Sequence, residues 1–162
     1  KVFDFKNFFF KEMRFRFVWI GKTKNKEWLA LQDDYLQRLS HFVKFEITEI
    51  KESQPHETKE TEAGRIMSTL TTSDFLVLLD VTGREQTSHE LANKIKKWQI
   101  QSIKEIIFVI GGQDGVTNEI QKRADVKLSL SQMTFTHEMA RVLLAEQLYR
   151  AFTIINNHPY QK

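Results

Sequence analysis

The sequence predicts an α/β fold: a mostly parallel β-sheet covered by helices on both faces. Short apolar runs alternate with amphipathic segments of helical periodicity along the chain. One run, residues 106–110 (IIFVI), is entirely apolar and ends at two glycines, which is typical of a strand buried on both faces. Alternating strands and helices connect through right-handed crossovers, so the strands are expected to lie parallel.

Each expected element has its own local signal. The partly alternating runs 14–20, 42–50 and 126–130 and the apolar runs 75–81 and 106–110 predict five strands. Helical spacing predicts five helices, over residues 25–39, 60–71, 87–101, 117–124 and 137–156. Thr87 and Glu90 have the spacing of a capping box, which marks the start of the third helix.

The last expected helix is apolar on nearly every side. Its apolar residues include Met139, Leu143, Leu148 and Phe152. A helix of this kind must be buried on several sides. In a chain of 162 residues we therefore expect this helix to form a homodimer interface.

The chain is expected to hold one domain, residues 13–162. The segment 1–12 (KVFDFKNFFFKE) holds five of the 13 phenylalanines and matches neither helix nor strand periodicity. We interpret it as a non-native or disordered extension upstream of Met13. The alternative is a genuine apolar arm that docks on the domain.

Composition excludes several classes of protein. There is no cysteine, which rules out disulfides and thiolate chemistry, and the five histidines are too scattered to suggest a metal site. No apolar run approaches the roughly 18 residues that span a bilayer, so a cytoplasmic protein is expected. The net charge is +3, or +2 without the extension. Because this excess is small, an RNA partner would have to be bound through a local cluster or by docking to a larger body.

Glycines mark a candidate ligand site. Four of the six lie where expected strands end: Gly83, and then Gly111, Gly112 and Gly115. Ligands of open α/β sheets bind at the carboxyl ends of strands, and glycine lets them approach the backbone. A dinucleotide-dependent oxidoreductase is one candidate, but the GGxxG pattern follows the fourth strand, whereas the dinucleotide fingerprint is GxGxxG after the first.

More specific segments lie in the carboxyl-terminal third: IGGQDG, LSLSQMTFTHEMARVLLAEQLYRA and NHPY, with RFVWIGK and LLDVTG before them. In this order the set resembles the RlmH family of ribosomal RNA methyltransferases, in the SPOUT superfamily. The resemblance implies a trefoil knot near the carboxyl end and a homodimer. It also implies methylation of the N3 position of a pseudouridine in 23S rRNA of the assembled ribosome, with S-adenosylmethionine as cofactor. A non-catalytic ribosome-binding or assembly factor of the same fold is the alternative.

The resemblance also implies which residues bind the cofactor. They are Leu79, Gly111, Leu130, Ser131, Gln132, Met133, Thr134 and Phe135. Apolar side chains and strand-end backbone groups can together enclose a flat, uncharged adenine. For Leu79 and Leu130 the alternative is plain core packing.

Catalytic and RNA-binding roles are expected at both ends of the last helix. His137 and Arg141 lie four residues apart and share a helix face. Arg141 could hold a phosphate or carboxylate with its planar fork, and His137 could orient the base or accept its proton. In the tail, Tyr160 could stack on a base. Arg150 and His158 are candidate RNA contacts, although Arg150 could equally form an interface ion pair.

Sequence leaves the proton acceptor open among Asp80, Glu138 and His137. The chain also departs from the family pattern twice. Thr136 stands where relatives usually have proline, which could loosen the cofactor loop. Gln161 stands where they often have histidine, so no role for a terminal histidine is expected here.

Overall fold

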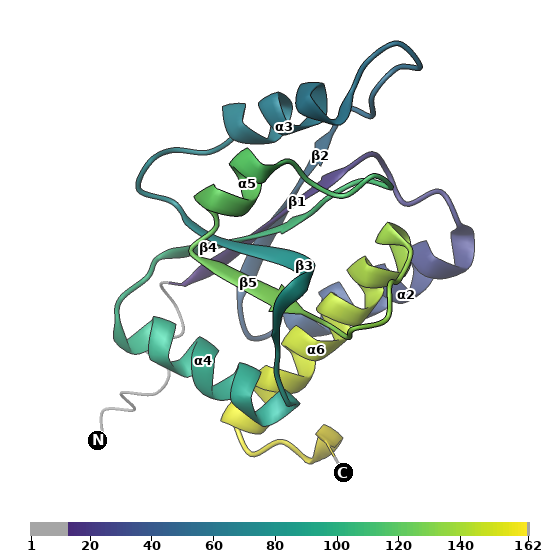
Figure 1. The fold of residues 1–162 in the computed structure, drawn as a ribbon. Helices are drawn as coiled ribbons and strands as arrows, with labels where there is room; N and C mark the ends of the chain where they lie inside the picture. Colours follow the sequence, from purple (N-terminus) through teal and green to yellow (C-terminus); the bar gives the residue numbers. More distant parts are fainter. Residues whose placement is uncertain (1–12, 162) are drawn as a thin grey trace.

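The computed structural model describes residues 13–161, and the expectation for residues 1–12 lies outside them. Five strands form one parallel sheet in the order β2-β1-β4-β3-β5 (Figure 1). They are β1 (Arg14–Ile20), β2 (Lys44–Ile50), β3 (Phe75–Glu85), β4 (Glu105–Ile110) and β5 (Val126–Ser129). The predicted α/β fold with a parallel sheet is confirmed.

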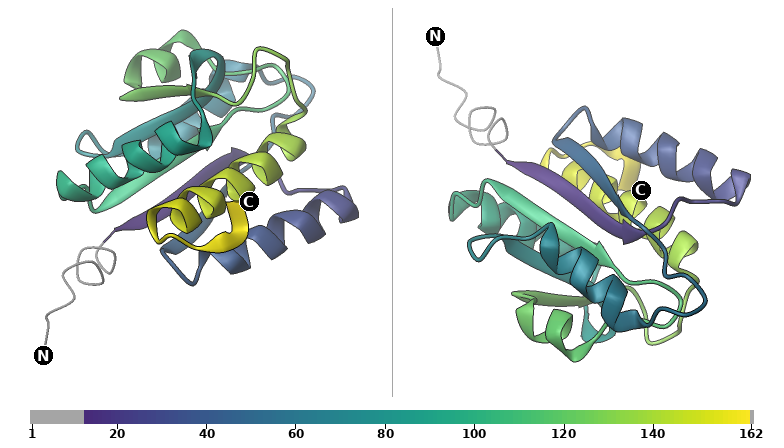
Figure 2. Two further views of the ribbon diagram at one scale, coloured as in Figure 1. Left: turned by 90° about the horizontal axis from the view of Figure 1, so that it is seen from below. Right: turned by 90° about the horizontal axis from the view of Figure 1, so that it is seen from above.

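Helices cover both faces of the sheet. On one face lie α2 (Lys26–Leu39), α4 (Ser88–Ile100) and α6 (His137–Ile155). On the other lie α3 (Lys59–Ser68) and α5 (Asn118–Arg123) (Figures 1 and 2). A short 3-10 helix, η1 (Pro159–Gln161), ends the described chain. All five predicted helices form, and the largest difference is that α3 ends at Ser68 instead of residue 71.

Strand β4 lies in the middle of the sheet and serves two cores. Ile106, Phe108 and Ile110 point toward the layer of α2, α4 and α6. Ile107 and Val109 point toward the layer of α3 and α5. Each of these side chains is at most 4% exposed, and burying one contributes about 1.5–3 kcal/mol. The sequence prediction of a strand buried on both faces is confirmed.

Strand β3 runs further than the sequence predicted. Leu79 and Arg84 both pair with Leu128, so residues 80–83 bulge out of the ladder. Within the bulge, the Asp80 Oδ1 atom accepts a hydrogen bond of 2.8 Å from the backbone N–H of Thr82. At Gly83 a Cβ atom would lie only 2.7 Å from the carbonyl carbon of Lys127. The close approach of β3 and β5 therefore requires glycine at this position.

Helix α6 lies between α2 and α4, with the sheet beneath it (Figure 2, left). Leu144, Leu148 and Phe152 on this helix are fully buried within the single chain. The expectation that its apolar surface requires a second chain is therefore not supported, because α2, α4 and the sheet already account for most of the burial. The homodimer remains a prediction on other grounds.

Gly83→Ala is expected to destabilise the protein by about 1–3 kcal/mol, since the new methyl group would overlap backbone atoms of β5. The matched control is Gly64→Ala in α3, where a Cβ would meet nothing within 4 Å. That change is expected to stabilise by roughly 1 kcal/mol, because alanine is the better helix former. Urea unfolding of the two variants measures both effects, and equal midpoints would contradict this account of the β3–β5 contact.

Candidate functional site

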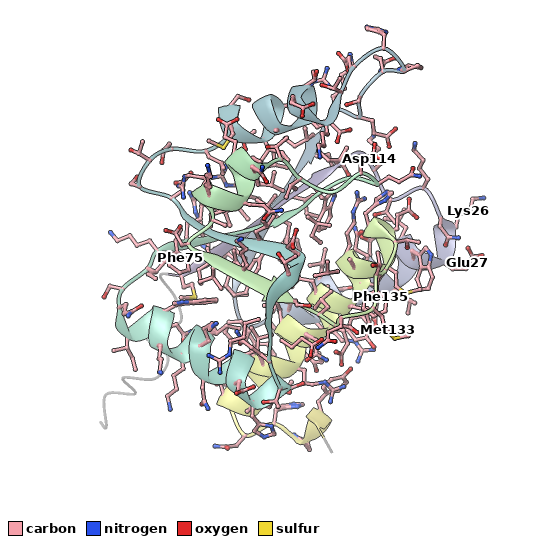
Figure 3. All side chains as sticks on the ribbon, viewed as in Figure 1. Lys26, Glu27, Phe75, Asp114, Met133 and Phe135 are labelled. Atoms are coloured by element: carbon pink, nitrogen blue, oxygen red, sulfur yellow. The ribbon has the colours of Figure 1, made fainter. Side chains whose placement is uncertain are left out.

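A cavity of about 690 Å³ lies at the carboxyl edge of the sheet. Its walls come from residues 79–81 of β3, where the bulge begins, the loop after β4, the loop between β5 and α6, and the first turn of α6. Met133 and Phe135 lie on the loop that leads into α6, at the other end of the sheet from Phe75 (Figure 3). The cavity therefore occupies the edge where the glycines predicted a ligand site.

The cavity walls are mostly apolar and carry few polar side chains. Leu79, Ile110 and Leu128 contribute apolar surface from three adjacent strands. Asp80, Ser131, Thr134 and His137 are among the polar groups. A cavity of this size and composition suits a small molecule with a flat apolar part and a few groups that fix its orientation.

Every predicted cofactor residue except Gln132 lines this cavity. Gln132 lies on the same loop, but its side chain is exposed. Leu79 and Leu130 are half-buried and face the cavity, so they do more than fill the core. Sequence analysis missed the wall residues Val116, Leu128 and Ala140. Each lies within five residues of a predicted site residue. Their apolar side chains could not be told from core residues in the sequence.

The glycine loop after β4 folds back on itself. Gly112 and Gly115 form an isolated antiparallel bridge, and the Gly115 N–H donates to the Gly112 carbonyl at 3.1 Å. Gly115 has a φ of 74°, which favours glycine. A Cβ on Gly111 would lie 2.7 Å from the Val116 Cγ1 atom. Gly111 is thus required by the tight packing of the loop, as well as by the room that the sequence analysis expected for a ligand.

His137 is the first residue of α6 and lines the cavity. Burial, and then the nearby positive charge of Arg141, lower the pKa of its imidazole. The ring is therefore neutral at physiological pH and can accept a proton. The preceding residue, Thr136, is the N-cap of the helix, and its side chain accepts a hydrogen bond from the Met139 N–H at 3.3 Å. Thr136, which stands where relatives usually have proline, thus caps α6, whereas the sequence suggested that it could loosen the cofactor loop.

Arg141 is 1% exposed and lies outside the cavity wall. Its guanidinium donates to the Thr23 Oγ1 atom at 2.9 Å and to the Ile20 carbonyl at 2.5 Å, and it lies 4.9 Å from the centre of the Trp19 ring. Burial lowers its pKa to about 10, so it stays charged. In this structure the fork donates to the last residue of β1 and to Thr23 after it, and a role in holding a substrate phosphate or carboxylate stays a prediction.

The three candidate proton acceptors are separated by the structure. The Glu138 carboxylate accepts hydrogen bonds from the backbone N–H groups of Lys24, at 2.7 Å, and Asn25, at 3.2 Å. These bonds lower its pKa, and Glu138 does not line the cavity. Asp80 and His137 do line it. Two candidates therefore remain for the proton transfer.

Arg150, His158 and Tyr160 gather at the opposite end of α6. The Tyr160 hydroxyl donates to the Glu146 carboxylate at 3.1 Å, and Arg150 forms an ion pair with that carboxylate and lies 5.1 Å from the Tyr160 ring centre. Burial, a hydrogen bond to Tyr35 and the Glu146 charge raise the pKa of Tyr160. Both contacts are made to Glu146, nine residues or about 14 Å along α6 from His137, and Arg150, His158 and Tyr160 do not line the cavity of their own chain.

Residues 13–161 contain neither a candidate metal site nor a candidate membrane-spanning helix. This part of the chain contains no cluster of three or more histidine, aspartate or glutamate side chains that could hold a metal ion. It also contains no helix that is both long and apolar enough to cross a bilayer.

The fold and the cavity at the carboxyl edge are those of a class of methyltransferases. Residues 13–161 match the family described as "Predicted SPOUT methyltransferase". The crystal structure of a probable methyltransferase from Bordetella pertussis Tohama I superposes with a TM-score of 0.58 at 14% identity, covering 90% of this chain and 98% of that one. At this identity the likeness concerns the fold alone.

Closer relatives narrow the class. A protein of Christiangramia forsetii named "Ribosomal RNA large subunit methyltransferase H" is 45% identical over 154 residues, covering 91% of this chain and 98% of its own. A protein of the same name from Oenococcus oeni is 39% identical over 159 residues, with 93% and 99% covered. The chain therefore belongs to the SPOUT methyltransferases, and within them to the ribosomal RNA large subunit methyltransferase H (RlmH) family, which confirms the resemblance seen in the sequence.

The imidazole of His137 is expected to titrate below the ordinary histidine value of about 6.5. Because the unfolded chain takes up this proton at higher pH than the folded one, stability should fall as pH drops through the window between the two values. NMR titration of the histidine rings measures the shift, and His137→Gln identifies the resonance. The variant should also lose that part of the pH dependence of unfolding. A His137 signal that titrates at or above the ordinary value would contradict this placement.

Proposed function

We propose that this chain is an S-adenosylmethionine-dependent methyltransferase that acts on the N3 position of a pseudouridine in 23S rRNA of the assembled ribosome. The observation that carries the proposal is the cavity, because its wall contains Leu79, Gly111 and the loop 130–135, the segments that the family resemblance assigns to the cofactor. The names of the relatives support ribosomal RNA as the substrate.

The residues present fit this cofactor. Leu79, Leu130 and Phe135 offer apolar surface to adenine, while the backbone groups of the two loops offer hydrogen bonds to its edge. When bound, S-adenosylmethionine would supply a methyl group on a positively charged sulfur: the N3 atom would bond to the methyl carbon in line as the carbon–sulfur bond breaks, and the sulfur would leave as a neutral thioether. The tightly packed glycine loop and the capped start of α6 hold the walls in place, so the main contribution of the protein is positioning.

The N3 atom must lose its proton before or during the transfer. His137 is suited to accept it, because its ring lines the cavity and its lowered pKa keeps it neutral. Asp80 is the second candidate, although its Oδ1 atom already accepts two hydrogen bonds from Thr82. We therefore assign the proton transfer to His137.

We further propose that two chains form a homodimer through α6 and build each site together. Arg150, His158 and Tyr160 do not line the cavity of their own chain. A two-fold dimer with α6 helices running in opposite directions would bring these residues of one chain to the cavity of the other. Arg150 and His158 would then contact RNA, and Tyr160 would stack against the target base.

The trefoil knot that the family implies is part of the same proposal. β5 lies at one edge of the sheet, whereas α6, which follows it, lies in the middle of a helical layer between α2 and α4. The chain must therefore turn back past the connection between β3 and α4. A trefoil knot formed by this passage is consistent with that course.

The proposed chemistry is tested by labelled methyl transfer from S-adenosylmethionine to ribosomes, isolated subunits and naked rRNA, with the modified base mapped. Transfer to a single pseudouridine in assembled ribosomes is expected. S-adenosylmethionine at 100 times its Kd should also stabilise the protein by about 2.7 kcal/mol and raise the Tm, whereas NAD should not. Stabilisation by the cofactor without any transfer would support the non-catalytic ribosome factor, and stabilisation by NAD alone would support the oxidoreductase.

The shared site predicts complementation between two inactive variants. His137→Ala removes the proton acceptor from the cavity, and a chain that ends at Asn157 lacks His158 and Tyr160. Each variant alone should lose most of its activity. Mixing equal amounts should restore roughly a quarter of the wild-type rate, because half of the dimers are mixed and each holds one complete site. If mixing restores nothing although mixed dimers form, the tail does not act in the partner's cavity.

A further inference from the structure

Residues 21–26, which are the connection between β1 and α2 together with the first residue of α2, lie beside the cavity. β1 pairs with β4, so the segment after β1 is next to the glycine loop that follows β4. The contact is close, since a Cβ on Gly112 would lie 3.6 Å from the Ile20 side chain. Figure 3 shows Lys26 and Asp114 on the same side of the molecule as Met133 and Phe135. We call residues 21–26 the β1–α2 loop.

This loop is fixed from within by α6. Arg141 donates to the Ile20 carbonyl and to Thr23, and Glu138 accepts from the backbone N–H groups of Lys24 and Asn25. Thr23 in turn donates to the buried Gln32 at 2.6 Å. The Asn25 side chain caps α2 by accepting from the Trp28 N–H at 2.9 Å. Such a loop loses little conformational freedom when it binds a partner.

Thr23 is buried, and the lysines on either side of it lie on the surface. Lys22, Lys24 and Lys26 are all exposed. Within residues 13–161, Lys22 and Lys26 form no ion pair, and Lys24 pairs only with Glu52, at 2.9 Å and with both side chains exposed. An exposed pair of this kind contributes little and can be exchanged for another anion. Lys24 is close enough to His137 for its charge to help lower the imidazole pKa.

We infer that Lys22, Lys24 and Lys26 on the β1–α2 loop bind backbone phosphates of the substrate RNA next to the target base. This inference rests on the proposed function, since the acceptor base in the cavity brings its neighbouring phosphates to the cavity rim. The small net charge of the chain favours a local cluster over the bulk charge as the means of contact. Glu27, Glu52 and Glu138 are the acidic side chains next to the lysines, and none of them lines the cavity.

The test compares two double charge reversals. Lys22→Glu with Lys26→Glu changes the loop and spares Lys24, whose charge acts on His137, and Lys44→Glu with Lys104→Glu changes two exposed lysines at the amino ends of β2 and β4, the opposite edge of the sheet. Ribosome binding is read by co-sedimentation at several salt concentrations, and methyl transfer gives kcat and KM. The loop variant should weaken ribosome binding and raise KM at least tenfold. Its kcat and its Kd for S-adenosylmethionine should stay within twofold of the wild type, and the control variant should match the wild type throughout.

The salt dependence identifies the partner. If two phosphate contacts are lost, the slope of log binding constant against log salt should become less steep by about 1.4. Weaker binding with an unchanged slope would overturn the assignment to RNA in favour of a ribosomal protein, and unchanged binding would overturn the contact altogether. Co-sedimentation does not depend on methyl transfer. If the wild-type protein binds ribosomes through the loop but does not bind S-adenosylmethionine, the proposed function is refuted and the inference about the loop is not.

Discussion

The position of α6 between α2 and α4 determines most of what this protein can do. Its buried apolar side chains hold both halves of the helical layer together, and its amino end lies at the carboxyl edge of the sheet. His137 therefore lines the cavity, while the Glu146 carboxylate that Arg150 and Tyr160 contact lies nine residues further on, about 14 Å along the helix. The same helix thus carries both His137, at the cavity, and Arg150, in its second half.

A second constraint ties the start of the domain to its end. Arg141 is a buried charge with two hydrogen bonds, a stacked tryptophan and one Nε atom without a partner in the described chain. Burying a guanidinium is costly unless it is well bonded, so the contact is more readily explained by positioning than by stability. It sets the shape of the β1–α2 loop from the first turns of α6. The same helix thereby positions both the cavity wall and the loop beside it.

Sequence periodicity predicted the sheet and helices well because apolar spacing is a local property. It failed where packing between distant segments decides the outcome. The bulge in β3 arises from pairing with Leu128, and nothing near Asp80 in sequence announces it. The family resemblance placed Leu79, Gly111 and most of the loop 130–135 at the cavity, but it could not show that Arg141 forms hydrogen bonds inside the fold. The apolar surface of α6, which the sequence suggested was an interface, is also explained by its packing against α2, α4 and the sheet of the same chain.

The order of the elements has a consequence for biosynthesis. The cavity needs the loop between β5 and α6, and α6 itself, which together occupy the last part of the chain. Strands β1 to β4 leave the ribosome earlier and can begin to pair, but the pocket has no closed wall until the final segment has been released. Contacts between distant segments also slow folding. A newly made chain should therefore acquire its ligand site only after α6 has left the ribosome.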